Sequence, residues 1–158
     1  MILKSKIINI LIIALIAFSL TSCKKNKNDV IPDVYVDFYV DLKDIIFRDL
    51  DAIGNHVIVT SQTNLWGQNS AGYDNNGIIV YRSDLDNFNA YDRTCPHDFA
   101  VNGLSIKVNI DGFNAICPQC STTYALYGLG TPISGPGRYP LKNYKTSFDG
   151  QGVHVWHH

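Results

Sequence analysis

Three cysteines and one histidine form two short clusters in the second half of the chain. One residue separates Cys95 from His97, and two residues separate Cys117 from Cys120. Thiolate sulfur and imidazole nitrogen are ligands that zinc and iron–sulfur clusters use, and these spacings let both side chains of a loop converge on a metal without straining the backbone. The pattern predicts a metal centre held by two loops, with two ligands from each loop.

Short β-prone runs surround the two clusters. Gly, Asp, Asn or Pro separates these runs, and no long amphipathic helix accompanies them, which is typical of a small antiparallel sandwich or barrel. Residues 43–53 carry apolar residues at a spacing compatible with one or two helical turns, and Gly54-Asn55 ends whatever forms there, so we expect a short irregular segment. We therefore expect one all-β domain in which each ligand loop follows the end of a strand. The expected strands span residues 34–42, 56–60, 77–81, 88–91, 104–108, 113–117, 123–127, 144–148 and 153–156.

The clusters and the residues that follow them resemble the Rieske family of [2Fe-2S] proteins. That family has Cys-x-His, an intervening segment, and then Cys-x-x-His followed by a small, a hydroxyl and an aromatic residue. Thr122 and Tyr124 stand at the hydroxyl and aromatic positions, and Gly135 and Pro136 lie in a segment similar to the family's proline loop. The resemblance implies that these four residues line the cofactor. It also implies a Rieske-like fold with a cluster-binding subdomain of two ligand loops.

The resemblance further implies a [2Fe-2S] cluster that exchanges one electron with a partner protein. Carried over by position, Cys95 and Cys117 would hold one iron, and His97 and Cys120 the other. Cys120 stands where the family has its second histidine, and Ser121 replaces the usual glycine. An anionic thiolate in place of an imidazole lowers the reduction potential towards that of all-cysteine clusters. We expect an intermediate potential with a weak pH dependence, because only one imidazole remains to titrate.

The same ligands also allow two interpretations without redox chemistry. Three thiolates and one imidazole are a common closed set for structural zinc. In an oxidising compartment, two of the three cysteines could instead form a disulfide. The chain would then be a non-redox interaction or structural protein. The sequence shows no nucleophile elbow, no hydrolase-type order of Ser, His and Asp, and no phosphate-binding glycine loop, so we do not expect an enzyme.

The N-terminal segment carries a targeting pattern. Two lysines precede an apolar run that is too short to span a bilayer comfortably, and the run ends in Leu20-Thr21-Ser22-Cys23, which resembles the lipobox of bacterial lipoproteins. The resemblance implies a signal peptide at residues 1–22 and a lipid on Cys23 that anchors the protein to a membrane. We expect a flexible linker over residues 23–33, a domain over residues 34–158, and a location on the extracytoplasmic side of a bacterial cell envelope.

The charge balance argues against one class of partner. Without the two lysines of residues 1–22, eleven Lys and Arg face fourteen Asp and Glu, a formal charge of −3. The few basic residues are scattered among carboxylates, and a surface that follows phosphates needs them clustered. We therefore expect no nucleic-acid partner.

Overall fold

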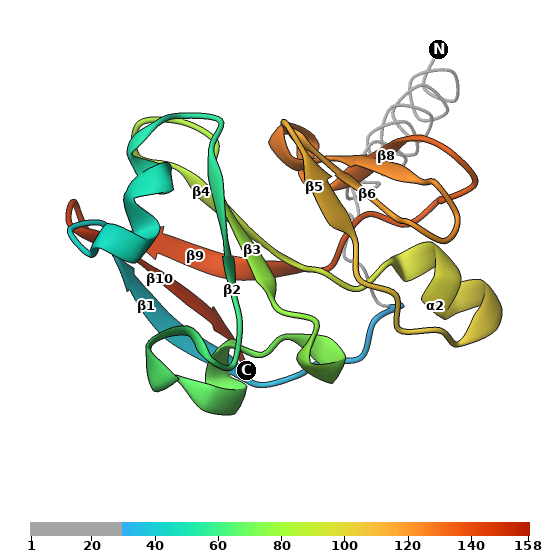
Figure 1. Ribbon diagram of the computed structural model, residues 1–158, viewed down its shortest axis with the longest axis horizontal. Helices are drawn as coiled ribbons and strands as arrows, with labels where there is room; N and C mark the ends of the chain where they lie inside the picture. Colours follow the sequence, from blue (N-terminus) through green and yellow to red (C-terminus); the bar gives the residue numbers. More distant parts are fainter. Residues whose placement is uncertain (1–29) are drawn as a thin grey trace, which may run out of the picture.

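The computed structural model describes residues 30–158, so Cys23 and the expected signal peptide lie outside the described residues. Strands provide most of the regular structure of the described part (Figure 1), and they form two antiparallel sheets. The expected all-β, antiparallel fold is confirmed. No helix among the described residues is both long and apolar enough to cross a membrane.

The larger sheet, here called the base sheet, has the strand order β1-β10-β9-β4-β3-β2. The residue pattern of strand β1 shows why the base sheet forms. Val36, Phe38 and Val40 point inward, while the intervening residues face outward or are partly covered. Together with buried residues of the other strands they make an apolar core. The strands are β1 (Val36–Asp41), β2 (His56–Val59), β3 (Ile78–Arg82), β4 (Phe88–Asp92), β9 (Asn143–Phe148) and β10 (Gly152–His157).

The smaller sheet, here called the ligand sheet, lies in an insert between β4 and β9. It has the order β5-β6-β7-β8, with β5 (Asn109–Asp111), β6 (Asn114–Ile116), β7 (Thr123–Ala125) and β8 (Thr131–Ser134). One short helix, α2 (Pro96–Asn102), precedes it, and Figure 1 shows the insert standing beside the base sheet. We use "the insert" for residues 93–142.

Strand β3 joins the two parts because both of its faces are covered. Ile78 and Val80 belong to the core of the base sheet, whereas Ile79 and Tyr81 belong to a second core shared with the insert. The insert is also closed at its root, where the Asp92 N–H donates to the carbonyl of Lys142 at 2.8 Å. The insert is thus packed on and hydrogen-bonded to the base sheet, so its loops start from a fixed position.

Several observed elements differ from those expected from the sequence. The segment expected to be irregular contains a 3-10 helix, η1 (Ile45–Asp51), because Phe47 and Leu50 turn inward and are buried. The strand expected over residues 104–108 is wrong, because its backbone bonds instead to the first ligand loop: Cys95 N–H donates to the carbonyl of Ile106, and Val108 N–H to that of Arg93. Strands β5 and β8 were not expected. The remaining 3-10 helices are η2 (Thr63–Leu65), η3 (Gly67–Ser70), η4 (Tyr73–Asn75) and η5 (Leu126–Gly128).

The first described residues pack on the domain. Ile31 is fully buried, and its carbonyl accepts a hydrogen bond from Lys142 Nζ at 3.0 Å. The same ammonium group pairs with the carboxylate of Asp33, which also accepts from His157. Contact with the domain therefore extends into the last residues of the segment that the sequence assigned to the linker.

Candidate metal centre

The first ligand loop places Cys95 between β4 and α2. Its N–H donates to the carbonyl of Ile106 at 2.8 Å, and its own carbonyl accepts from the Phe99 N–H at 3.2 Å. Pro96 follows at the first helical position, where a fixed φ and a missing N–H cost nothing. Because the backbone is held on both sides, the buried thiol of Cys95 has a defined position.

The second ligand loop is the tight turn between β6 and β7. The Cys117 N–H donates to the carbonyl of Thr122 at 2.9 Å, and the Ser121 N–H donates to the carbonyl of Cys117 at 3.0 Å. Ser121 has a φ of 59°, a left-handed conformation that costs a non-glycine residue roughly 1–2 kcal/mol. That conformation gives a physical reason for the glycine that the resembled family has at this position.

A third segment, the covering loop (residues 134–137), lies on Thr122. The Gly137 N–H donates to Thr122 Oγ1 at 3.0 Å, and a Cβ at Gly135 would lie only 2.6 Å from the Thr122 Cα. The close approach, together with a φ of +85°, requires glycine at 135. Gly135 and Pro136 are exposed. The covering loop therefore reaches the second ligand loop at Thr122, the neighbour of the thiols.

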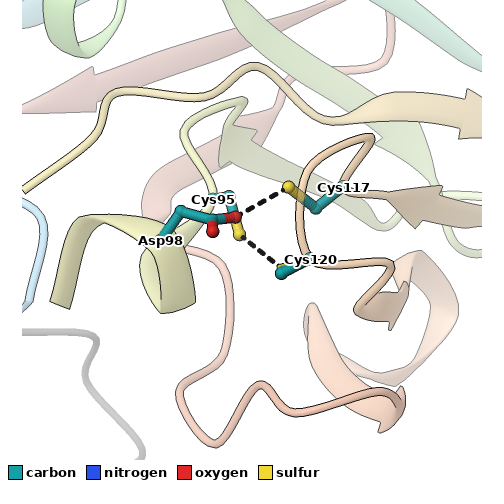
Figure 2. A group of neighbouring side chains, drawn as sticks. All are labelled: Cys95, Asp98, Cys117 and Cys120. Atoms are coloured by element: carbon teal, nitrogen blue, oxygen red, sulfur yellow. Dashed lines mark hydrogen bonds between the residues drawn. The ribbon is translucent and has the colours of Figure 1, made fainter. Parts of the chain in front are cut away.

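The two ligand loops bring three thiols and one carboxylate together. One ligand atom each from Cys95, Asp98, Cys117 and Cys120 lies within 4.8 Å of all the others, and Figure 2 shows these side chains pointing toward one another. The sulfurs of Cys95 and Cys120 are 3.7 Å apart. Two thiolates on one tetrahedral ion, at a metal–sulfur distance of about 2.3 Å, would be roughly 3.8 Å apart. The spacing therefore matches two ligands of a single metal ion.

The protonation of the group follows from its burial. Burial raises the pKa of Cys95 to about 11, and burial together with the Asp98 carboxylate raises the pKa of Cys117 even further. Burial alone would raise the pKa of Asp98 as well, but hydrogen bonds from the three thiols outweigh it and hold that pKa below its usual value. At neutral pH the free site thus holds the neutral thiols of Cys95 and Cys117 beside a carboxylate, and a metal would displace their protons when it binds.

Two buried hydroxyl groups contact the sulfurs. The Tyr124 hydroxyl is 3.3 Å from Cys95 Sγ, and Thr122 Oγ1 is 3.2 Å from Cys120 Sγ. In the free site the Cys120 thiol donates to Thr122 Oγ1, which also accepts from the Gly137 N–H, so the hydroxyl proton of Thr122 can point at sulfur only once the thiol proton is lost. With metal-bound thiolates both hydroxyls would be donors, and hydrogen bonds to ligand sulfur tune a metal centre.

The structure also distinguishes two neighbours on α2. His97, the ligand expected from the sequence, is half-exposed and is not part of the four-residue group. Asp98, which the sequence analysis did not single out, is 2% exposed, and its carboxylate accepts from Cys117 Sγ at 2.9 Å. A helix starting at Pro96 puts positions 95 and 98 on one face, so recognising that start would have revealed Asp98.

Known proteins resemble the chain in structure but not in sequence. No family model matches it, and no curated protein matches it. Similar solved structures include the ferredoxin of carbazole 1,9a-dioxygenase from Nocardioides aromaticivorans IC177, with 16% identity and a TM-score of 0.44 over 76% of this chain and 96% of that chain. The Sphingomonas yanoikuyae B1 ferredoxin has 14% identity and a TM-score of 0.46, covering 77% and 99%.

A third similar structure is a complex of reduced oxygenase and oxidised ferredoxin in carbazole 1,9a-dioxygenase. It has 19% identity and a TM-score of 0.44, and the match covers 73% of this chain and 96% of that chain.

Proposed function

We propose that this chain is a lipid-anchored, Rieske-like electron carrier that binds a [2Fe-2S] cluster between its two ligand loops. The observation that carries the proposal is the convergence of Cys95, Cys117 and Cys120, none of them in a disulfide, beneath two hydroxyl groups that contact their sulfurs. The donor set fits the cofactor, because iron–sulfur clusters are held chiefly by cysteine thiolates. When bound, the cluster would supply a group that accepts and releases one electron.

The residues of the chain would set the properties of that group. Cys95 and Cys117 are fully buried and keep water from their side of the centre, whereas Cys120 and His97 are partly exposed. An electron would enter and leave on this exposed side, where a redox partner protein can approach. Hydrogen bonds from Thr122 and Tyr124 to sulfur would raise the potential, and the thiolate of Cys120 would lower it.

We further propose that Cys23 carries the lipid and that the domain lies on the extracytoplasmic side of a bacterial membrane. The support is the lipobox-like sequence that ends at Cys23. Fractionation of cells that produce the full chain tests this step. The native protein should sediment with membranes, and a Cys23→Ala variant should not carry the lipid. Intact-mass measurement of the detergent-extracted protein checks the acyl modification.

A structural zinc ion is the second candidate. The specific observation in its favour is compactness: all four ligand atoms lie within 4.8 Å of one another, as around a single tetrahedral ion. In this case the insert would be a zinc-stapled module on a β scaffold, and the protein would have no redox activity.

Metal analysis of the full-length protein in detergent separates the candidates. Iron, acid-labile sulfide, zinc and free thiols are counted on one sample, and its visible absorption and its EPR spectrum after reduction are recorded. Two irons and two sulfides per chain, with a reduced-state EPR signal, support the electron carrier. A colourless protein with one zinc ion, or with a disulfide and no metal, would rule it out.

A further inference from the structure

We propose that Asp98, rather than His97, is the fourth protein ligand of the metal centre. The inference rests on the proposed function only in that Cys95, Cys117 and Cys120 must hold a metal. It changes the donor set from three sulfurs and one nitrogen to three sulfurs and one oxygen.

The placement of Asp98 is the first reason. Asp98 lies three residues after Cys95 on the first turn of α2, so both side chains project from the same face of the turn. Its carboxylate lies within 4.8 Å of all three sulfurs (Figure 2), and its side chain is almost completely buried. His97 is one position earlier, rotated around the helix, and does not share this arrangement.

The electrostatic surroundings of Asp98 are the second reason. The ion pairs found among residues 30–158 join Lys142 or His157 to Asp33, and His154 to Asp37, and none involves Asp98. Its carboxylate accepts from Cys117, and a thiol is a weak donor. A buried carboxylate without an ion-pair partner is costly. A metal cation at the centre of the four groups would remove that cost.

The geometry of the set is the third reason. The 3.7 Å between the sulfurs of Cys95 and Cys120 is already a ligand-to-ligand distance, and the 2.9 Å between Asp98 Oδ2 and Cys117 Sγ is a hydrogen bond that metal binding would break. Loss of the thiol proton frees the carboxylate oxygen to turn to the metal. Only small side-chain movements are then needed, whereas His97 would have to enter from outside the group.

The test uses Co²⁺ added to reduced, metal-free full-length protein in detergent. Asp98→Asn keeps the size of the side chain and removes its charge, and His97→Gln is the matched variant one residue away. Affinity is measured by competition with a chelator, and the number of thiolates on cobalt is read from the sulfur-to-cobalt absorption. We expect Asp98→Asn to weaken Co²⁺ binding by at least about tenfold, and His97→Gln to change it less than about twofold.

The outcomes separate the two proposals. Weak binding by His97→Gln with normal binding by Asp98→Asn would overturn the role of Asp98 and leave the metal centre intact. Absence of Co²⁺ binding by the native protein, with three thiols free to react, would overturn the metal centre itself. X-ray absorption of the native cobalt protein needs no variant: carbon scattering from an imidazole ring supports His97, and its absence, with one oxygen and three sulfurs, supports Asp98.

Discussion

The base sheet and the insert differ in what fills their cores. Strands of four to six residues build the base sheet, and its core consists of aliphatic and aromatic side chains. The strands of the ligand sheet have three or four residues, and the core beneath them includes the thiols of Cys95 and Cys117. Apolar burial contributes roughly 25 cal/mol per Å², so the smaller core, with two thiols in it, gains less from apolar burial than the core of the base sheet does. We therefore expect the insert to depend more than the base sheet on the metal that its cysteines are proposed to bind.

Metal removal should produce the largest difference between the two parts. A structural metal can contribute roughly 10–16 kcal/mol in small zinc domains, so we expect amides of β6 and β7 to lose at least about 3 kcal/mol of protection when the metal is removed. Amides of β1 and β10, whose buried residues lie only in the core of the base sheet, should change by less than about 0.5 kcal/mol. Hydrogen exchange followed by mass spectrometry, with and without metal, checks this. Equal losses in both sheets would contradict the comparison.

Leu50→Ala should destabilise the base sheet and leave the metal affinity of the insert unchanged. Leu50 is fully buried in the core of the base sheet. Its truncation leaves a cavity, so global stability in denaturant should fall by about 2–5 kcal/mol. Metal affinity of the folded protein should stay within about twofold of the native value, since the side chain lies outside the core shared with the insert. A parallel loss of metal affinity would show that the parts are strongly coupled.

Gly135→Ala tests the contact of the covering loop with the second ligand loop. The added Cβ would collide with the backbone of Thr122 in addition to straining a left-handed φ, so we expect a loss of about 2–3 kcal/mol and weaker metal binding. Gly150→Ala is the control, because Gly150 has a similar φ of +90° but nothing near the position of its Cβ. That variant should lose only about 1 kcal/mol and keep its metal affinity. Equal effects at the two sites would show that only the backbone strain matters.

Tyr124→Phe removes the hydroxyl beside Cys95 Sγ. We expect a stability loss of about 1 kcal/mol and, in the iron-loaded protein, a lower reduction potential, because a hydrogen bond to ligand sulfur is lost. Tyr91→Phe is a matched control in the same core, since the Tyr91 hydroxyl donates to the carbonyl of Leu126 at 2.8 Å. It should lose similar stability without a change in potential. Redox titration of both variants distinguishes the two roles.

The smallest expected effect is acid sensitivity at Asp33. Its hydrogen bond with Lys142 is the main cause that lowers the pKa of Asp33 to about 2. The resulting stability is complete above the unfolded pKa near 4 and is lost as the pH falls through about 2. Because the carboxylate is 63% exposed, its solvent-screened contribution should be less than about 1 kcal/mol. Denaturation of the native protein and of Asp33→Asn should differ at pH 6 and converge near pH 2.

The sequence predicted the base sheet better than the insert. Alternation of apolar residues located β1, and short apolar runs located β2, β3 and β10, because each of these strands buries residues in a large core. Strand β8 (Thr131–Ser134) contains a proline and only partly buried or exposed side chains, so its sequence carries no burial pattern. The residues expected as a strand over 104–108 pair with the first ligand loop, and such a contact depends on tertiary structure.

The residues of the candidate site were also predicted only in part from the sequence. Ligand-like spacing identified the three cysteines, and the structure brings them together. Asp98 could not be found by spacing between cysteines, because its position depends on where α2 begins and on which face of its first turn meets the second ligand loop. The prediction for His97 came from its spacing to Cys95 and from the family resemblance, and the cobalt experiment tests it against Asp98.

Closure of the insert at its root has a consequence for the order of folding. Strands β4 and β9 pair with each other through Ala90 and Tyr144, so the base sheet holds both ends of the insert side by side. Once the base has formed, the entropy of bringing those ends together has already been lost, and the insert can open and close as a local folding unit. Metal could therefore be loaded or exchanged while the rest of the domain stays folded.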